Sequence, residues 1–131
     1  MQSSVLDTNR VMSLLELDEP NEVDSFFADL VKEFTSEASH LIQSINQSIQ
    51  QQDSASLATY SHSFRGASLN MGAIALARVC DILETDARRS QLAGTYACLG
   101  EIETLYQVTI YALETIKDQA VNRSGQHGIS Y

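Results

Sequence analysis

Cysteine, basic residues and long hydrophobic runs are all scarce in this sequence. Only Cys80 and Cys98 occur among the 131 residues, too few for a disulfide framework or a cysteine-ligated zinc site, and we expect both to be small core residues. No apolar run approaches the roughly 18 residues that a membrane span requires. The residues after Met1 show neither a basic segment nor an apolar stretch of the signal-peptide kind, so we expect a cytoplasmic protein.

The scarcity of basic residues leaves a net charge of −9, from eight Lys and Arg against seventeen Asp and Glu. Most of such a surface repels nucleic acid. The acids are unevenly spread, because the window 54–100 holds three of them beside four arginines, whereas the flanking windows are acidic. A phosphoryl group would therefore meet a locally positive potential in the middle of the chain.

Apolar residues recur at steps of three and four along most of the sequence, the period of amphipathic helices. We predict a short helix capped by Asp7 or Thr8, a long helix capped by Asn21, and three further helices. Asp53 is expected to cap the third helix and Gly72 to end it, and Thr95 is expected to cap the last. The predicted apolar positions of the first helix are Val11, Met12, Leu14 and Leu15. The apolar stripe of the second helix is expected to begin at Phe26.

Short connections between long amphipathic helices favour antiparallel neighbours. The length suits a single domain. We therefore predict an all-α fold, an antiparallel four-helix bundle with a short additional N-terminal helix. The bundle is expected to occupy residues 1–121, and the glycine-containing segment 122–131 is expected to be a flexible tail.

The third helix carries the residues that best suit a reactive site. At about 100° per residue, His62 lies roughly 160° from the apolar Phe64, so it should face water. Arg65 and Gly66 follow three and four residues later and share that face. A glycine inside a helix costs about 1 kcal/mol relative to alanine, and we interpret Gly66 as removing a side chain that would crowd the imidazole. An open imidazole beside a guanidinium suits a nucleophile that must receive and hold a bulky dianion.

At these residues the chain resembles the histidine-containing phosphotransfer (HPt) domains of multistep phosphorelays. Their signature, His-x-x-Lys/Arg-Gly, then small residues and a helix-ending glycine, appears here as His62-Ser63-Phe64-Arg65-Gly66-Ala67-Ser68 and Gly72. With the flanking helices, the resemblance covers roughly residues 5 to 120. It implies that His62 accepts a phosphoryl group from the aspartyl phosphate of a receiver domain and passes it to another receiver. Arg65 and the matching Arg88 would help to hold that group.

The resemblance also implies a carrier without turnover activity and without a cofactor, because the receiver supplies the Mg²⁺. No nucleotide-binding motif occurs in the sequence. We expect a monomer that binds receivers through a small apolar surface next to His62. Its predicted members are Leu69 and Ala73 on the histidine face, with Leu14 or Leu15 at the adjoining end.

Two other functions are compatible with a helical bundle. A metal-binding bundle is suggested by Glu37-Ala38-Ser39-His40, which has the Glu-x-x-His spacing of di-iron proteins. Such proteins need a second copy of this motif, but Thr59 stands three residues before His62, and the helical phase turns His40 outward. A non-catalytic adaptor that binds receivers without accepting phosphate is the other alternative, and the presence of both His62 and Arg65 argues against it.

Overall fold

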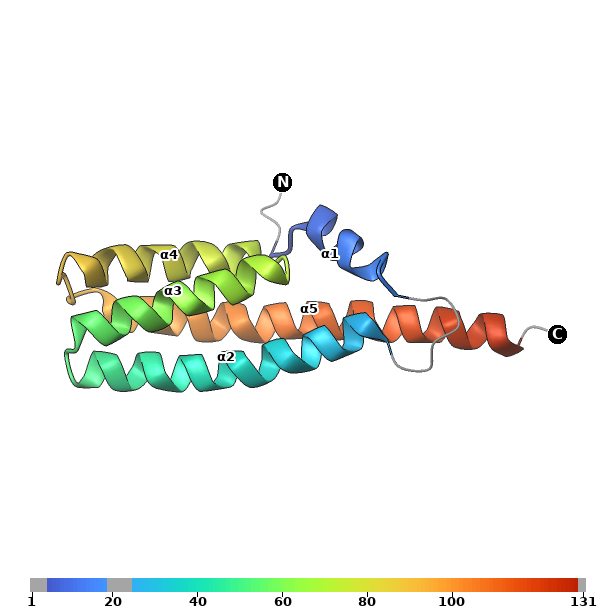
Figure 1. Cartoon of the computed structure of the whole chain (residues 1–131). Helices are drawn as coiled ribbons and strands as arrows, with labels where there is room; N and C mark the ends of the chain where they lie inside the picture. Colours follow the sequence, from blue (N-terminus) through green and yellow to red (C-terminus); the bar gives the residue numbers. More distant parts are fainter. Residues whose placement is uncertain (1–4, 19–24, 130–131) are drawn as a thin grey trace.

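The computed structural model describes residues 5–18 and 25–129, with side chains as far as residue 120. These ranges contain five helices and no strand: α1 (Thr8–Leu15), α2 (Phe26–Gln50), α3 (Ser54–Asn70), α4 (Ile74–Arg88) and α5 (Thr95–Ile129). Helices α2 to α5 lie side by side, and α3 and α5 each pack against both α2 and α4 (Figure 1). The predicted all-α four-helix bundle with a short additional helix is therefore confirmed. None of the helices in these ranges has the combination of length and hydropathy needed to cross a bilayer.

The core forms where the apolar stripes of the four long helices meet. Phe34 of α2 lies between two aromatic rings, with its centroid 6.4 Å from that of Phe64 on α3 and 6.4 Å from that of Tyr106 on α5. The largest completely buried apolar side chains come from all four bundle helices: Phe27, Ile45, Leu57, Phe64, Leu76, Leu83, Ile102 and Leu113. Two predicted apolar positions are wrong, because Met12 and Phe26 are exposed. Each lies one residue out of phase with a buried neighbour, Val11 and Phe27 respectively.

Short polar side chains cap the first three helices. The carboxylates of Asp7 and Asp53 accept hydrogen bonds from the backbone N–H groups at the start of α1 and α3, as predicted. The start of α2 differs from the prediction, because Ser25 is its N-cap, whereas Asn21 lies outside the described residues. Asp18 reinforces this start by accepting hydrogen bonds from Ser25 Oγ at 2.9 Å and from the Phe27 backbone N–H at 3.0 Å. These two bonds join the end of α1 to the beginning of α2.

The start of α1 packs against the turn between α3 and α4. Gly72 ends α3 with a φ of +76°, the left-handed conformation predicted for it. Its carbonyl accepts a 2.7 Å hydrogen bond from the backbone N–H of Asp7, and the carbonyl of Asn70 accepts one of 2.9 Å from Arg10 Nε. A Cβ at Gly72 would lie 3.1 Å from both Asp7 O and Val11 Cγ2. Glycine is thus required here both for its backbone conformation and for the close approach of α1.

The last helix departs from the prediction at both ends. Gly94, rather than Thr95, accepts the first helical hydrogen bond, from Cys98 N, and the Thr95 hydroxyl instead donates to Leu92 O. At the other end the helix continues to Ile129 and so includes most of the segment 122–131 that was expected to be a tail. Glycines in a helix interior cost only about 1 kcal/mol each, and without a C-terminal turn they do not stop a helix. Whether residues 122–131 are flexible stays a prediction.

Candidate functional site

His62 lies in the middle of α3 with 62% of its side chain exposed to solvent. Its rotation about the helix axis is set by its neighbours, because Ser61 and Phe64 are both completely buried. Phe64 contributes most to this orientation, since turning His62 inward would remove a whole aromatic ring from the core. The prediction that the imidazole faces water is confirmed.

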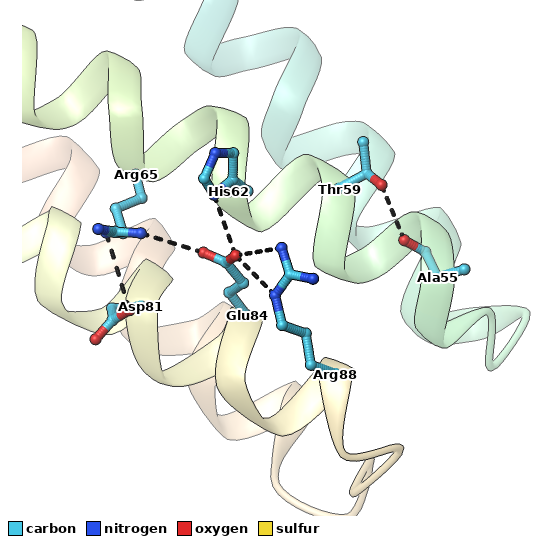
Figure 2. Close-up of polar contacts among 7 residues, drawn as sticks. All are labelled: Ala55, Thr59, His62, Arg65, Asp81, Glu84 and Arg88. Atoms are coloured by element: carbon cyan, nitrogen blue, oxygen red, sulfur yellow. Dashed lines mark hydrogen bonds and ion pairs between the residues drawn. The ribbon is translucent and has the colours of Figure 1, made fainter.

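A buried carboxylate on the neighbouring helix contacts the imidazole. Oε2 of Glu84 on α4 lies 3.1 Å from Nδ1 of His62. The same oxygen accepts two hydrogen bonds from Arg88, at 3.0 Å from Nε and 2.7 Å from Nη2, while Oε1 lies 3.4 Å from Arg65 Nη1. Figure 2 shows the Glu84 carboxylate between the three side chains, with Asp81 beside Arg65. We call these five residues the Glu84 cluster.

The Glu84 contact selects which imidazole nitrogen is free. An ionised carboxylate only accepts hydrogen bonds, so Nδ1 of a neutral His62 must carry the proton that it shares with Glu84. The lone pair is then on Nε2, the nitrogen that points away from the cluster in Figure 2. Although burial raises the pKa of Glu84, the hydrogen bonds from Arg88 and His62 outweigh that effect and hold the pKa below its ordinary value. Glu84 is therefore ionised at neutral pH, as this arrangement requires.

The two arginines differ in how firmly Glu84 holds them. Arg88 makes short, charge-assisted bonds through two nitrogens to a single oxygen, a pair four residues apart on α4. Arg65 makes only long contacts, 3.4 Å to Glu84 and 3.9 Å to Asp81. When His62 is neutral, the charges of the two guanidiniums and the two carboxylates in the cluster sum to zero. The locally positive potential expected from the sequence is thus offset at the histidine itself, because α4 places its acids beside the arginines.

In the free protein Gly66 is not needed to leave room for the imidazole ring, and its role in steric access for a partner stays a prediction. A Cβ built on this residue would meet no atom within 4 Å, and this includes the His62 ring. The imidazole contacts Glu84 of α4 instead. In the free protein an alanine would therefore fit at residue 66, and any functional need for glycine arises only when another molecule approaches this face.

The predicted docking residues do not all lie on the surface. Leu69 is exposed and Leu15 is partly exposed, whereas Ala73 and Leu14 are buried. The expectation that Ala73 projects from the histidine face is wrong, because Ala73 is completely buried after the left-handed turn at Gly72. Leu14 packs into the core from α1 and is not available to a partner.

Sequence reasoning missed Glu84 and Asp81, the two acids of the cluster. A partial signal was present, since Glu84 and Arg88 have the i, i+4 spacing of a helical ion pair. Nothing local indicates that this pair faces His62, because that depends on the register between α3 and α4.

The metal-binding alternative finds no support in the part of the chain that the structure describes. There, no group of three or more His, Cys, Asp or Glu side chains could hold a metal ion. Glu37 and His40 are both on the exposed side of α2, as the helical phase predicted for His40.

The structure thus combines a four-helix bundle with an exposed histidine on α3 whose ring contacts a buried carboxylate of α4. A family model described as the Hpt domain matches residues 29–115, more than half of the chain. The chain therefore belongs to the Hpt family, the histidine phosphotransfer intermediates of two-component phosphorelays. Members of this family carry a phosphoryl group between other proteins and are not turnover enzymes.

Solved structures agree with this assignment. Histidine-containing phosphotransfer protein B from Pseudomonas aeruginosa PAO1 is 27% identical, with a TM-score of 0.80 over 90% of this chain and 98% of that one. Two plant phosphotransfer proteins share the fold. ZmHP2 from maize is 19% identical, with a TM-score of 0.75 over 94% of this chain and 86% of that one. MtHPt2 from Medicago truncatula is 18% identical, with a TM-score of 0.72 over 88% of this chain and 83% of that one. None of the curated proteins is similar enough to match this sequence.

Proposed function

We propose that His62 is the phosphoacceptor, and that it takes a phosphoryl group from the aspartyl phosphate of one receiver domain and passes it to another. The observation that carries this proposal is the contact between His62 Nδ1 and Glu84, because in a neutral imidazole it puts the lone pair on Nε2, on an exposed face. Of the three histidines in the sequence, His40 has no partner of this kind among the described residues, and His127 lies where no side chain is described.

The transfer is a displacement at phosphorus. The Nε2 lone pair attacks in line, an N–P bond forms, and the P–O bond of the acyl phosphate breaks to release the aspartate carboxylate. The reverse step, on a second receiver, regenerates the imidazole. Because phosphoryl transfer depends mainly on positioning and on neutralising charge, a small helical face suffices when the receiver contributes its own aspartate and Mg²⁺.

We assign different roles to the two arginines from the strength of their contacts. Arg65 gives up only two long contacts when it turns toward a phosphoryl group on Nε2, so it is the residue that holds this group. Arg88 would have to break two short bonds to Glu84, so its role is to fix the carboxylate that orients His62. Arg65→Ala is expected to slow transfer more than Arg88→Ala does.

The docking surface is proposed to combine this site with apolar side chains at the adjoining end of the bundle. Leu69 and Leu15 remain from the predicted set, and the exposed Met12 of α1 adds to them. The hydrogen bond from Arg10 to Asn70 keeps α1 beside the last turn of α3, so these residues belong to one end of the molecule. A few exposed apolar side chains beside a charged site suit a transient complex. The monomeric state and the cytoplasmic location stay predictions.

A receiver domain carrying ³²P-labelled aspartyl phosphate tests the proposal. Label stable to alkali and labile to acid is expected on the protein and is expected to be absent from His62→Gln. His40→Gln is the matched control, since it removes another exposed helical histidine and is expected to accept label normally. Label on His62→Gln would refute the assignment, and binding of the receiver without any label on the wild type would favour the adaptor function.

A further inference from the structure

We propose that Glu84 keeps a proton on Nδ1 of His62 throughout the transfer cycle, including while Nε2 carries the phosphoryl group. Glu84 thereby keeps the phosphorylated protein an effective donor at neutral and alkaline pH. This inference rests on the proposed phosphoacceptor role of His62, and it makes Glu84 a positioning residue that acts through the imidazole.

The reason lies in the group that leaves when the N–P bond breaks. The electron pair of that bond returns to Nε2, and the phosphorus is taken by the attacking carboxylate oxygen of the receiver. If Nδ1 carries a proton, the departing group is neutral imidazole. If Nδ1 has lost its proton, the departing group is an imidazolate anion, which leaves far less readily. A proton held on Nδ1 means that no proton has to be taken from water in either direction.

The structure places an anion where this proton must be held. A ring with phosphorus on Nε2 and a proton on Nδ1 has a cationic imidazole, which an adjacent carboxylate stabilises. Glu84 Oε2 is 3.1 Å from Nδ1, and the two bonds from Arg88 to the same oxygen prevent the carboxylate from turning away. Because Glu84 is buried, its charge is poorly screened by water and salt.

The other charged groups at the site balance one another. Arg65 faces the cluster from α3, and Asp81 and Arg88 face it from α4. Within the described residues, no charged side chain of α2 or α5 pairs with a member of the cluster. The two arginines oppose a cationic ring, whereas Asp81 and Glu84 favour it, and Glu84 is the member in direct contact with Nδ1.

The test uses protein phosphorylated on His62 with phosphoramidate, so that no receiver is needed. The ¹⁵N chemical shifts of the ring report whether Nδ1 is protonated, and ³¹P spectra follow the loss of the phosphoryl group to water between pH 6 and 9. In the wild type we expect Nδ1 to stay protonated above pH 8 and the rate of loss to change less than about threefold between pH 6.5 and 8.5. In Glu84→Gln we expect the rate to fall at least tenfold over that interval, because the ring then lacks the adjacent anion that holds its Nδ1 proton.

Glutamine separates orientation from charge, because it keeps an oxygen that can accept a hydrogen bond from Nδ1 but carries no charge. Glu101→Gln, which neutralises an exposed acid on α5, is the control and is expected to retain the wild-type pH profile. A loss of rate in Glu84→Gln that is equal at every pH would mean that Glu84 only orients the ring, and the proposal would be overturned. Deprotonation of Nδ1 near pH 6.5 in the wild type would overturn it without any variant. A failure of receivers to label His62 would contradict the proposed function and leave this result standing.

Discussion

Replacing Gly66 with alanine is expected to stabilise the protein and, at the same time, to slow phosphoryl transfer. Gly66 lies inside α3, where glycine destabilises a helix by about 1 kcal/mol relative to alanine. The new methyl group would meet no atom within 4 Å, so no steric penalty offsets that gain. We therefore expect the free energy of unfolding to rise by about 1 kcal/mol, which corresponds to roughly 3 to 5 °C in Tm for a chain of this size.

The effect on transfer is expected only when a receiver is present. The methyl group would project from the same exposed face as His62 and Arg65, one turn from the imidazole. A receiver must bring its aspartyl phosphate within bonding distance of Nε2, so we expect the rate of transfer to fall by about tenfold or more, since misplacing reacting groups by about 1 Å can reduce a rate a hundredfold. Thermal unfolding by circular dichroism and rapid-quench transfer from a labelled receiver measure the two effects.

Gly100→Ala provides the matched control for this substitution. Gly100 is an interior residue of α5 that is exposed, and a Cβ there would also meet nothing within 4 Å. We expect the same gain in stability with an unchanged transfer rate. If Gly66→Ala transferred as fast as the wild type, the glycine would have no part in the approach of the receiver, and our interpretation of the histidine face would be refuted.

Three further predictions concern stability and reactivity. Gly72→Ala is expected to lower the free energy of unfolding by about 2 kcal/mol, because the left-handed conformation disfavours alanine and the methyl group would press on α1; an unchanged Tm would contradict this. The folded state lowers the pKa of Glu84 from 4.5, so the stability that its charge contributes is present above about pH 4.5 and lost below it. The difference in unfolding free energy between the wild type and Glu84→Gln is therefore expected to shrink as the pH falls through that region, and urea titrations measure this difference. Burial raises the pKa of Cys80 to about 12, so an aromatic disulfide reagent is expected to label Cys98 in the native protein well before Cys80, and equal rates would be inconsistent with the described packing.

The helical faces of this protein follow directly from its sequence. The period of the apolar residues gave the bundle and the buried stripes of α2, α4 and α5, because a helix with one apolar face must bury that face. The same period placed His62 on the water side of α3, opposite Phe64. Capping is equally local, and the short-range chemistry of Asp7, Asp53 and Gly72 was sufficient to predict where α1 and α3 begin and where α3 ends.

The errors occur where neighbouring helices decide the outcome. Ala73 looked exposed when α3 was considered alone, but in the folded bundle it is completely buried. We interpreted Gly66 as removing a side chain that would crowd the imidazole, but a Cβ at this residue would meet no atom of the ring, which contacts Glu84 of α4. A pattern within one helix carries no information about which residues of the next helix it meets.

The sequence alone therefore determined that an imidazole would be exposed in the middle of a helical bundle, because that depends only on the 100° step between successive residues. Tertiary structure alone decided which nitrogen of that imidazole is free. Glu84 follows His62 by 22 residues in the sequence. It contacts His62 only because the buried faces of α3 and α4 pack in a particular register, which places the Glu84 carboxylate 3.1 Å from Nδ1.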